Sequence, residues 1–500
     1  MTTYLGIDIG TFESKGVLVD ASGVIIAQAA HPHKMLVPQA GWAEHDAQAD
    51  WWGDFVCLAD ELLHQSNISP SDIRAVACSA IGPCMLPVDA AGKPLRNAIL
   101  YGVDTRAHKE IDDLNAEIGA DRILAECGNA LTSQSVGPKI LWFKRQQPEL
   151  FARTHKFVTS TTFLVHRLTG RYAIDPYTAA NFSPIYTNRR ADWSEDLTSQ
   201  IVGRDKLPEI RWTSAIAGQI TARAAHETGL AAGTPVLTGT IDAAAEALSV
   251  GVTAPGDTMV MYGSTIFIIQ ITADRLRDNR LWTAPWLFPG QHAAMSGLAT
   301  SGTLTHWLRD TIAQDLPKDT AFAALAVEAQ ASPPGANRLL MLPYFSGERT
   351  PIHDPHAKGV VFGLNLTHTR GDIYRAALEG IGFATNHILE SYADAGAPPA
   401  QLFAVGGGTK NKVWLQATTD ISGRPQIIRK ISAGAAYGDA FLAALAMGDV
   451  KIDDINAWNP IVETILPNPQ HAALYQQRFD IFKALYTQTK GSMAALDLTA

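Results

Sequence analysis

The feature that most constrains the fold is a hairpin pattern that occurs twice, once at the N-terminus and once halfway along the chain. Apolar runs at residues 4–9, 15–19 and 24–29 are separated by short turns, which predicts an antiparallel meander. A similar pair of apolar runs, residues 258–262 and 265–271, flanks a Gly-Ser turn. Two hairpins of one kind predict a duplicated architecture.

Each hairpin is followed by alternating helical and strand patterns, which is typical of α/β proteins. Helical spacing occurs at residues 51–64, 138–146, 373–392, 414–422 and 435–447, and strand patterns occur at 73–78, 156–159, 235–240 and 401–405. A cluster of small residues near 247–255 marks the boundary between the halves. We therefore expect an α/β protein with a cleft between two domains, residues 1–247 and 248–500.

Composition excludes several classes of function. At roughly 100–200 residues per domain, 500 residues suffice for two large domains. The net charge of −9 excludes an overall basic surface for nucleic acid, so any anion site must be built locally. Four cysteines without CxxC spacing indicate free cytosolic thiols. The 15 histidines show no paired metal-ligand spacing. With no signal-peptide or membrane-span pattern, we expect a soluble cytoplasmic protein without nucleic-acid or membrane partners.

The first turn carries residue types that suit a phosphate group. Gly10 lets the backbone approach an anion closely, and the Thr11 hydroxyl and Lys15 ammonium can contact phosphate oxygens. Asp8, at the end of the preceding strand, can hold Mg²⁺, usually through water. The same Asp-x-Gly-Thr pattern also forms ordinary hairpin turns, so both interpretations stay open.

Two later segments could complete a nucleotide site. Gly263-Ser264-Thr265 forms the equivalent turn of the second half, where it could clasp a phosphate chain from the other side of the cleft. At residues 404–411 (AVGGGTKN) a strand runs into three glycines and a helix, which would present bare backbone to a nucleotide. Neither segment matches GxxxxGK[ST] or GxGxxG. An ordinary turn, or a loop that needs positive φ, is the alternative for each.

Asp242 is a candidate general base, because it stands where a strand becomes a helix in GTIDAAAEALSV. Ligands of α/β proteins bind at that edge, and a helix N-terminus favours the ionised carboxylate that accepts a hydroxyl proton. A simple helix cap is the alternative. Likewise, Glu348-Arg349 in PYFSGERTP could be a charged active-site pair or an ion pair that holds a loop.

Taken in order, these segments resemble the FGGY family of carbohydrate kinases. The resemblance covers nearly the whole chain and includes GIDIGTFESKGVLVD, GWAEHDAQADWW, KILWFKRQ, GTIDAAAEALSVG and AVGGGTKNKVWLQ. Its most specific part is residues 359–379, with G-x-V-x-G-L, seven residues, and D-I-x-x-A-A-L-E. The resemblance implies two ribonuclease-H-like domains of the actin-like ATPase fold. It also implies transfer of phosphate from ATP, with Mg²⁺, to a sugar or polyol hydroxyl.

Carried over position by position, the resemblance implies roles for individual residues. Asp242 is similar to the catalytic base, and Asp8 and Asp242 are similar to the carboxylates near Mg²⁺. The implied nucleotide contacts are Gly10, Thr11, Lys15, Gly263, Ser264, Thr265, Gly302, Gly407, Gly408 and Asn411. The implied sugar contacts are Gly82, Pro83, Tyr101, Asp104 and Asp242.

The sequence departs from the family pattern at three places, one of which is the segment at residues 101–106 (YGVDTR), one residue longer than the usual Trp-Asn-Asp-Gly-Arg form. Phe12 and Glu13 stand where the phosphate loop usually has small hydroxyl residues, so we expect Glu13 to point away from phosphate. The turn at residues 79–84 (SAIGPC) offers only Gly-Pro where xylulokinases carry Gln-Met-His-Gly and glycerol kinases carry Arg-Glu. This turn therefore lacks the side chains that bind a sugar hydroxyl in those proteins.

The similarity is greatest to xylulokinases, which makes a pentulose the expected substrate. Another ketose or polyol, of ribulose, glycerol or erythritol type, stays open because of the Gly-Pro turn. A non-catalytic actin-like module that uses nucleotide as a switch is an alternative of another class, and the presence of both Asp8 and Asp242 argues against it. We expect the sugar and ATP as partners, and the sequence leaves a homodimer open.

Overall fold

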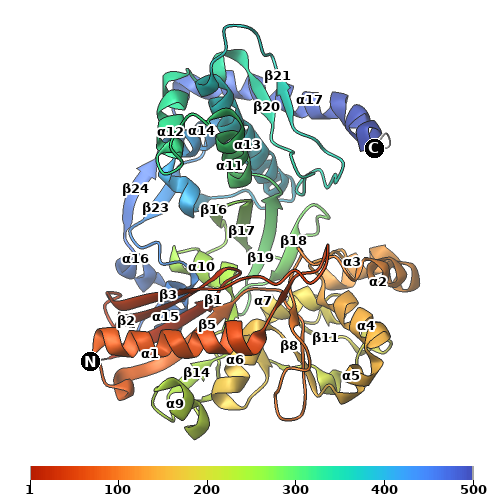
Figure 1. Ribbon diagram of the computed structural model, residues 1–500, viewed down its shortest axis with the longest axis vertical. Helices are drawn as coiled ribbons and strands as arrows, with labels where there is room; N and C mark the ends of the chain where they lie inside the picture. Colours follow the sequence, from red (N-terminus) through yellow and green to blue (C-terminus); the bar gives the residue numbers. More distant parts are fainter. Residues whose placement is uncertain (1, 498–500) are drawn as a thin grey trace.

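The structure, a computed structural model, describes residues 2–497. It has two halves, each built on a seven-stranded sheet, with the first half at the bottom of Figure 1 and most of the second half at the top. Helix α10 (Asp242–Ser249) lies where the two halves meet (Figure 1). None of the described helices is long and apolar enough to cross a membrane.

The first sheet has the strand order β13-β14-β5-β1-β2-β3, with β15 beside β5. Its strands are β1 (Thr3–Ile9), β2 (Glu13–Asp20), β3 (Ile25–Pro32), β5 (Ile73–Ala80), β13 (Ile216–Gln219), β14 (Pro235–Leu237) and β15 (Thr240–Ile241). Strands β1, β2 and β3 are antiparallel, and β5 and β14 continue the sheet in parallel. The meander predicted from the first thirty residues is confirmed.

The second sheet repeats this arrangement in the order β18-β19-β17-β16-β22-β23-β24. Its strands are β16 (Asp257–Tyr262), β17 (Ile266–Thr272), β18 (Trp282–Pro285), β19 (His292–Leu298), β22 (Gln401–Val405), β23 (Gln426–Arg429) and β24 (Ile461–Ile465). Strands β19, β17 and β16 are antiparallel, and β22 and β23 follow in parallel. Both sheets contain a run of three antiparallel strands (β3-β2-β1 and β19-β17-β16) followed by two parallel ones (β5-β14 and β22-β23), which confirms the duplicated α/β architecture of the actin-like fold.

Among residues 2–497, five short strand pairs lie outside the two main sheets. They are β4 (Glu44–His45) with β7 (Ala98–Ile99), β6 (Leu86–Val88) with β8 (Lys156–Val158), β9 (Ala173–Ile174) with β12 (Glu209–Ile210), β10 (Tyr186–Thr187) with β11 (Asp192–Trp193), and β20 (Leu340–Leu342) with β21 (Val360–Phe362). The strand predicted at residues 156–159 is therefore present as β8, but it belongs to a small pair and not to the alternation of the main sheet.

The helices cover both sheets. They are α1 (Asp54–Ser66), α2 (His108–Leu114), α3 (Ala120–Cys127), α4 (Val136–Gln146), α5 (Pro148–Arg153), α6 (Ser160–Thr169), α7 (Pro176–Ala179), α8 (Glu195–Thr198), α9 (Ala222–Thr228), α11 (Gly302–Ile312), α12 (Ala321–Ala331), α13 (Arg370–Asp394), α14 (Lys412–Ser422), α15 (Ala435–Ala446), α16 (Ile455–Trp458) and α17 (Ala472–Asp497). A π-helical turn, η1 (Ala47–Gly53), leads into α1. Helix α13 begins earlier than its apolar pattern because Thr369 and Asp372 form a capping box.

Helix α15 belongs to the second half of the sequence but packs on the first sheet, beside β1 and α10 (Figure 1). Glycines make this approach possible. A Cβ on Gly6 would lie 1.9 Å from the Ala436 carbonyl oxygen, and one on Gly438 would lie 1.9 Å from that of Ala245. Backbones this close exclude any larger residue. A division at 247/248 stays a prediction, because α15 links the later chain to the first sheet.

Candidate active site

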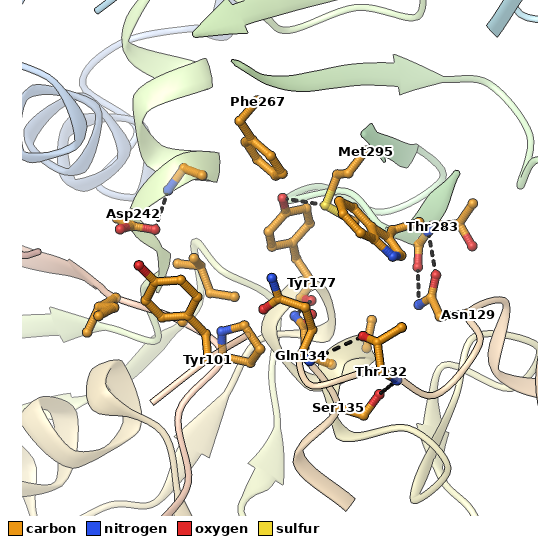
Figure 2. A pocket seen from close by; sticks show the side chains of 18 of the residues that line it. Tyr101, Asn129, Thr132, Gln134, Ser135, Tyr177, Asp242, Phe267, Thr283 and Met295 are labelled. Atoms are coloured by element: carbon orange, nitrogen blue, oxygen red, sulfur yellow. Dashed lines mark hydrogen bonds between the residues drawn. The ribbon is translucent and has the colours of Figure 1, made fainter. Parts of the chain in front are cut away.

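A cavity of about 350 Å³ lies between the two halves and is lined by residues of both. Six residues expected from the sequence line it: Thr11, Gly82, Pro83, Tyr101, Asp242 and Thr265. Figure 2 shows the Asp242 carboxylate and the Tyr101 ring on one side, across from Asn129 and Thr283. Tertiary folding thus brings the candidate base, the Gly-Pro turn and the second hairpin to one space.

A second cavity, of about 490 Å³, is lined by the glycine-containing segments of the second half. The expected residues that line it are Gly263, Ser264, Gly302, Gly407, Gly408 and Asn411. Its walls also include the aromatic rings of Phe322, Tyr374 and Trp414. Flat apolar walls together with bare backbone suit a purine nucleoside.

The turn of the second hairpin borders both cavities. Ser264 lines the second cavity, and the next residue, Thr265, lines the first. The N-terminus of α11 holds this turn, since Gly302 N–H donates to the Gly263 carbonyl (3.0 Å) and Thr303 N–H donates to the Ser264 carbonyl (3.1 Å). A phosphate chain running from the second cavity toward Asp242 would cross this turn.

Asp242 is the first residue of α10, and its Oδ1 accepts a hydrogen bond from Ala243 N–H at 2.7 Å. Burial raises the pKa of its carboxyl well above the ordinary value, and the nearby charge of Asp8 raises this pKa further. The sequence led us to expect the opposite direction, from the helix N-terminus. Desolvation acts on the whole charge, whereas the helix terminus contributes only a partial charge, so burial prevails.

Asp8 is the second-last residue of β1; it is buried and lines neither of the two cavities. The Ser79 hydroxyl lies 3.0 Å from Asp8 Oδ1 and 2.7 Å from Oδ2 of Asp439 on α15. Burial raises the pKa of Asp8 to about 6. Glu246, one turn beyond Asp242, lines the first cavity, and burial together with Asp8 raises its pKa to about 7.

These carboxylates fit a divalent cation that arrives with a nucleotide. Among residues 2–497, no group of three or more His, Cys, Asp or Glu residues is arranged to hold a metal ion by itself. Mg²⁺ commonly takes one or two carboxylates and completes its shell with phosphate oxygens and water. Asp8 and Asp242 match that limited donor set.

The remaining residues of the first turn are held by the protein itself. Gly10 N–H donates to the Glu13 carbonyl at 3.2 Å, and the Lys15 ammonium pairs with the Glu13 carboxylate at 3.1 Å. The side chains of Lys15 and Glu13 are about half exposed. Neither Gly10 nor Lys15 lines either of these two cavities, whereas Thr11 lines the first.

Asp104 differs from its expected role as a sugar contact. Its buried carboxylate accepts hydrogen bonds from Arg106 Nε (2.9 Å) and Nη2 (2.7 Å) and from Ala43 N–H (2.7 Å). The Arg106 guanidinium also lies 3.8 Å from the centre of the Trp42 ring. Asp104 does not line the cavity, and its oxygens already have partners. In the structure Asp104 stabilises the segment that carries Tyr101.

Several cavity residues were not expected from the sequence, among them Gln134 and Asn181. Gln134 lies in a run of polar residues at 132–135, just before α4. This run is the sequence feature that could have identified Gln134 as a site residue. Buried Lys139 positions the run, because its ammonium donates to the carbonyls of Ser133 (2.6 Å) and Leu100 (2.7 Å). Burial lowers the pKa of Lys139 to about 8.

The Glu348-Arg349 segment fits neither alternative weighed above. Glu348 Oε1 accepts hydrogen bonds from the backbone N–H groups of Ala299 and Arg349, at 2.7 and 2.6 Å. Burial raises the pKa of Glu348 to about 7. Arg349 lines the first cavity and supplies a cationic side chain from the second half.

Comparison with known proteins agrees with this site. The N-terminal domain of the FGGY family of carbohydrate kinases matches residues 3–249, and the C-terminal domain matches residues 258–447. The chain is 30% identical to the xylulose kinase of Bacillus subtilis (strain 168) over 99% of both proteins. It is 30% identical to that of Escherichia coli (strain K12) over 98% of this chain and 100% of the relative.

A solved structure gives the same result for the fold. The crystal structure of xylulose kinase from Rhodospirillum rubrum has a TM-score of 0.92 and 32% sequence identity to this chain, covering 98% of it and 100% of that protein. The resemblance inferred from the sequence motifs is confirmed. This chain belongs to the FGGY family of carbohydrate kinases and is a carbohydrate kinase.

Proposed function

We propose that this kinase transfers the γ-phosphate of Mg-ATP to a terminal hydroxyl of a pentulose, with Asp242 as the general base. The observation that carries the proposal is the shared turn at Gly263–Thr265, which borders both the cavity with Asp242 and the cavity with the glycine-rich loop. The relatives at 30% identity are xylulose kinases, which supports a pentulose.

Sugar hydroxyls would be bound by polar side chains that line the same cavity as the Gly-Pro turn. Gln134 Oε1 accepts a hydrogen bond from Gly102 N–H (3.1 Å), which leaves its amide N–H groups to donate. Asn181 Nδ2 donates to the Thr178 carbonyl (3.3 Å), and its Oδ1 has no partner among the described residues. Asn129 is different, because both its amide atoms bond the backbone of Thr283 (2.7 and 2.9 Å) and so join the two halves.

Phosphoryl transfer needs mainly positioning and charge stabilisation. Asp242 would orient the hydroxyl and accept its proton, and Arg349 would place a positive charge at the same cavity. Bound Mg²⁺ would neutralise phosphate charge, and Asp8 and Asp242 are the carboxylates that would hold it. A cation beside a carboxylate lowers its pKa, which would offset the effect of burial on Asp242.

Replacement of the base tests the mechanism. We expect Asp242→Asn to lower kcat by at least about 10²-fold, the usual contribution of a general base, with a much smaller change in ATP affinity. Glu246→Gln is the matched control, because it removes a carboxylate from the same helix and the same cavity. Equal losses in both variants, or near-wild-type turnover by folded Asp242→Asn, would contradict the assignment of Asp242.

A substrate panel tests the acceptor. We would measure kcat/KM with Mg-ATP for D-xylulose, L-xylulose, D-ribulose, L-ribulose, glycerol and erythritol. The proposal expects the highest value for a pentulose, with weaker discrimination among pentuloses than polar side chains at residues 82 and 83 would impose. A clear preference for glycerol or erythritol would replace the pentulose with a polyol.

Three further expectations remain proposals. The free thiols of Cys57, Cys78, Cys84 and Cys127 support a reducing compartment, and we propose the cytoplasm. We keep the division into residues 1–247 and 248–500, supported by the family-model boundaries at 249 and 258. A homodimer stays a prediction, to be tested by light scattering of the purified protein.

A further inference from the structure

His33, which directly follows β3, contacts the first turn at two points. Its ring Nε2 lies 3.1 Å from the Gly10 carbonyl oxygen, and its backbone N–H donates to the Phe12 carbonyl at 3.0 Å. These two carbonyls lie on either side of Thr11, the residue of this turn that lines the first cavity. A single residue therefore holds the backbone on both sides of Thr11.

The partners of the His33 ring determine its charge. Nδ1 lies 2.7 Å from Asp54 Oδ2, and Nε2 lies 3.1 Å from the Gly10 carbonyl. A carbonyl oxygen and a carboxylate oxygen both accept hydrogen bonds only, so both ring nitrogens must donate. Asp54 is an acceptor here, because Ser14 Oγ donates to the same Oδ2 at 2.6 Å. His33 is therefore an imidazolium.

We propose that cationic His33 is a positioning residue, which orients the Thr11 segment for the ATP phosphates and releases it when the ring loses its proton. The proposal rests on the function proposed above, because it gives the first turn a role in phosphate binding. A peptide bond is planar and trans, so holding the Gly10 carbonyl also sets the direction of the Thr11 N–H. The bond that deprotonation of Nε2 removes is the one that fixes this amide.

Titratable groups on four elements lie near the His33 ring or share its partner Asp54. They are Asp54 on α1, Asp50 on η1, His31 on β3 and His45 on β4. Burial lowers the pKa of His33, but the hydrogen bond and charge of Asp54, with the charge of Asp50, raise it above the ordinary value. His45 is neutral because its Nδ1 accepts from the Trp51 indole N–H at 3.1 Å, and burial lowers its pKa to about 4.

Nuclear magnetic resonance of the wild-type protein tests the charge directly. The ¹⁵N shifts of the His33 ring should report two protonated nitrogens at neutral pH and a pKa above the ordinary histidine value of about 6.5. A neutral tautomer at neutral pH would overturn the proposal. This readout needs no turnover, so it stands apart from the proposed function, which fails instead if no sugar in the panel is phosphorylated.

Two substitutions at His33 separate its two contacts. The amide nitrogen of Gln stands the same number of bonds from Cα as Nε2, whereas that of Asn corresponds to Nδ1. His33→Gln should keep the hydrogen bond to the Gly10 carbonyl, so its KM for ATP should lie within about threefold of the wild-type value. This KM should not change as the pH passes the pKa of His33 in the wild-type protein. His33→Asn reaches only Asp54 and should raise this KM about tenfold, the effect of one charged hydrogen bond, with less change in kcat.

His31→Gln is the matched control, because His31 shares Asp54 (2.7 Å) but has a half-exposed ring that makes no hydrogen bond to residues 10–13 of the described structure. The ratio of the wild-type KM for ATP to that of His33→Gln at each pH removes the titration of ATP itself, and His31→Gln, which keeps His33, should follow wild type. Wild-type KM for ATP should rise as pH passes the His33 pKa measured by magnetic resonance. Equal KM values for His33→Gln and His33→Asn, or a wild-type KM that is flat through that pKa, would overturn the proposal.

Discussion

Gly407→Val tests whether adenosine lies against the glycine-rich loop. Gly407 begins a 3₁₀ turn (Gly407–Lys410) after β22 and lines the second cavity. Apart from Gly407 and its two chain neighbours, no atom of the described residues lies within 4 Å of a Cβ built at this position, and the positive φ of the loop belongs to Gly406 (91°). The valine side chain therefore enters open space in the ligand-free protein, and we expect unfolding free energy to change by no more than about 0.5 kcal/mol.

With nucleotide bound, the same side chain would compete with adenosine for space. Overpacking costs about 1–3 kcal/mol, which corresponds to roughly a fivefold to 150-fold rise in the Kd for ADP. Titration calorimetry with ADP measures this change, and thermal unfolding monitors the fold. The KM for the sugar should change little, because Gly407 does not line the first cavity.

Gly408→Ala is the control for this experiment, because its Cβ would lie 2.5 Å from Cζ3 of Trp414 and 2.9 Å from Cβ of Tyr262. We expect that clash to lower stability by about 1–3 kcal/mol even without nucleotide. The reasoning is refuted if folded Gly407→Val binds ADP with wild-type affinity. In that case the triple-glycine loop is only a turn.

Two other predictions concern stability. Asp104→Ala removes one partner of the buried Asp104–Arg106 ion pair, so we expect it to lower the unfolding free energy measured with denaturant by about 3–5 kcal/mol. The KM for the sugar should be nearly unchanged. A raised KM without loss of stability would assign Asp104 to the sugar site after all. Burial raises the pKa of Asp372, but hydrogen bonds from Ser332 and Thr369 hold it at about 2, below its unfolded value of 3.8. The ionised carboxylate therefore stabilises the protein above pH 3.8 by roughly 2 kcal/mol, and this contribution is lost as pH falls through about 2. The difference in unfolding free energy between wild type and Asp372→Asn should shrink on acidification, and a difference independent of pH would contradict this account.

The sequence by itself determined the two hairpins, the alternation of helices and strands and the glycine-rich loop. Each of these depends on local properties that neighbouring residues carry, such as apolar periodicity and the turn preferences of glycine. The same local signals marked Asp242, Thr11 and the turn at residues 263–265 as site residues. Motifs that lie far apart in the sequence therefore identify residues that line both cavities.

Only the tertiary structure decided which side chains reach the cavities and in which charge state. Asp104 and Gln134 both lie in polar segments of the sequence. In the structure Arg106 binds the Asp104 carboxylate, whereas Gln134 lines the first cavity. Burial and the nearby charge of Asp8 raise the pKa of Asp242, and the contacts of Asp54 and Gly10 make His33 a cation. Desolvation and hydrogen-bond partners depend on residues distant in sequence, so no local pattern encodes them.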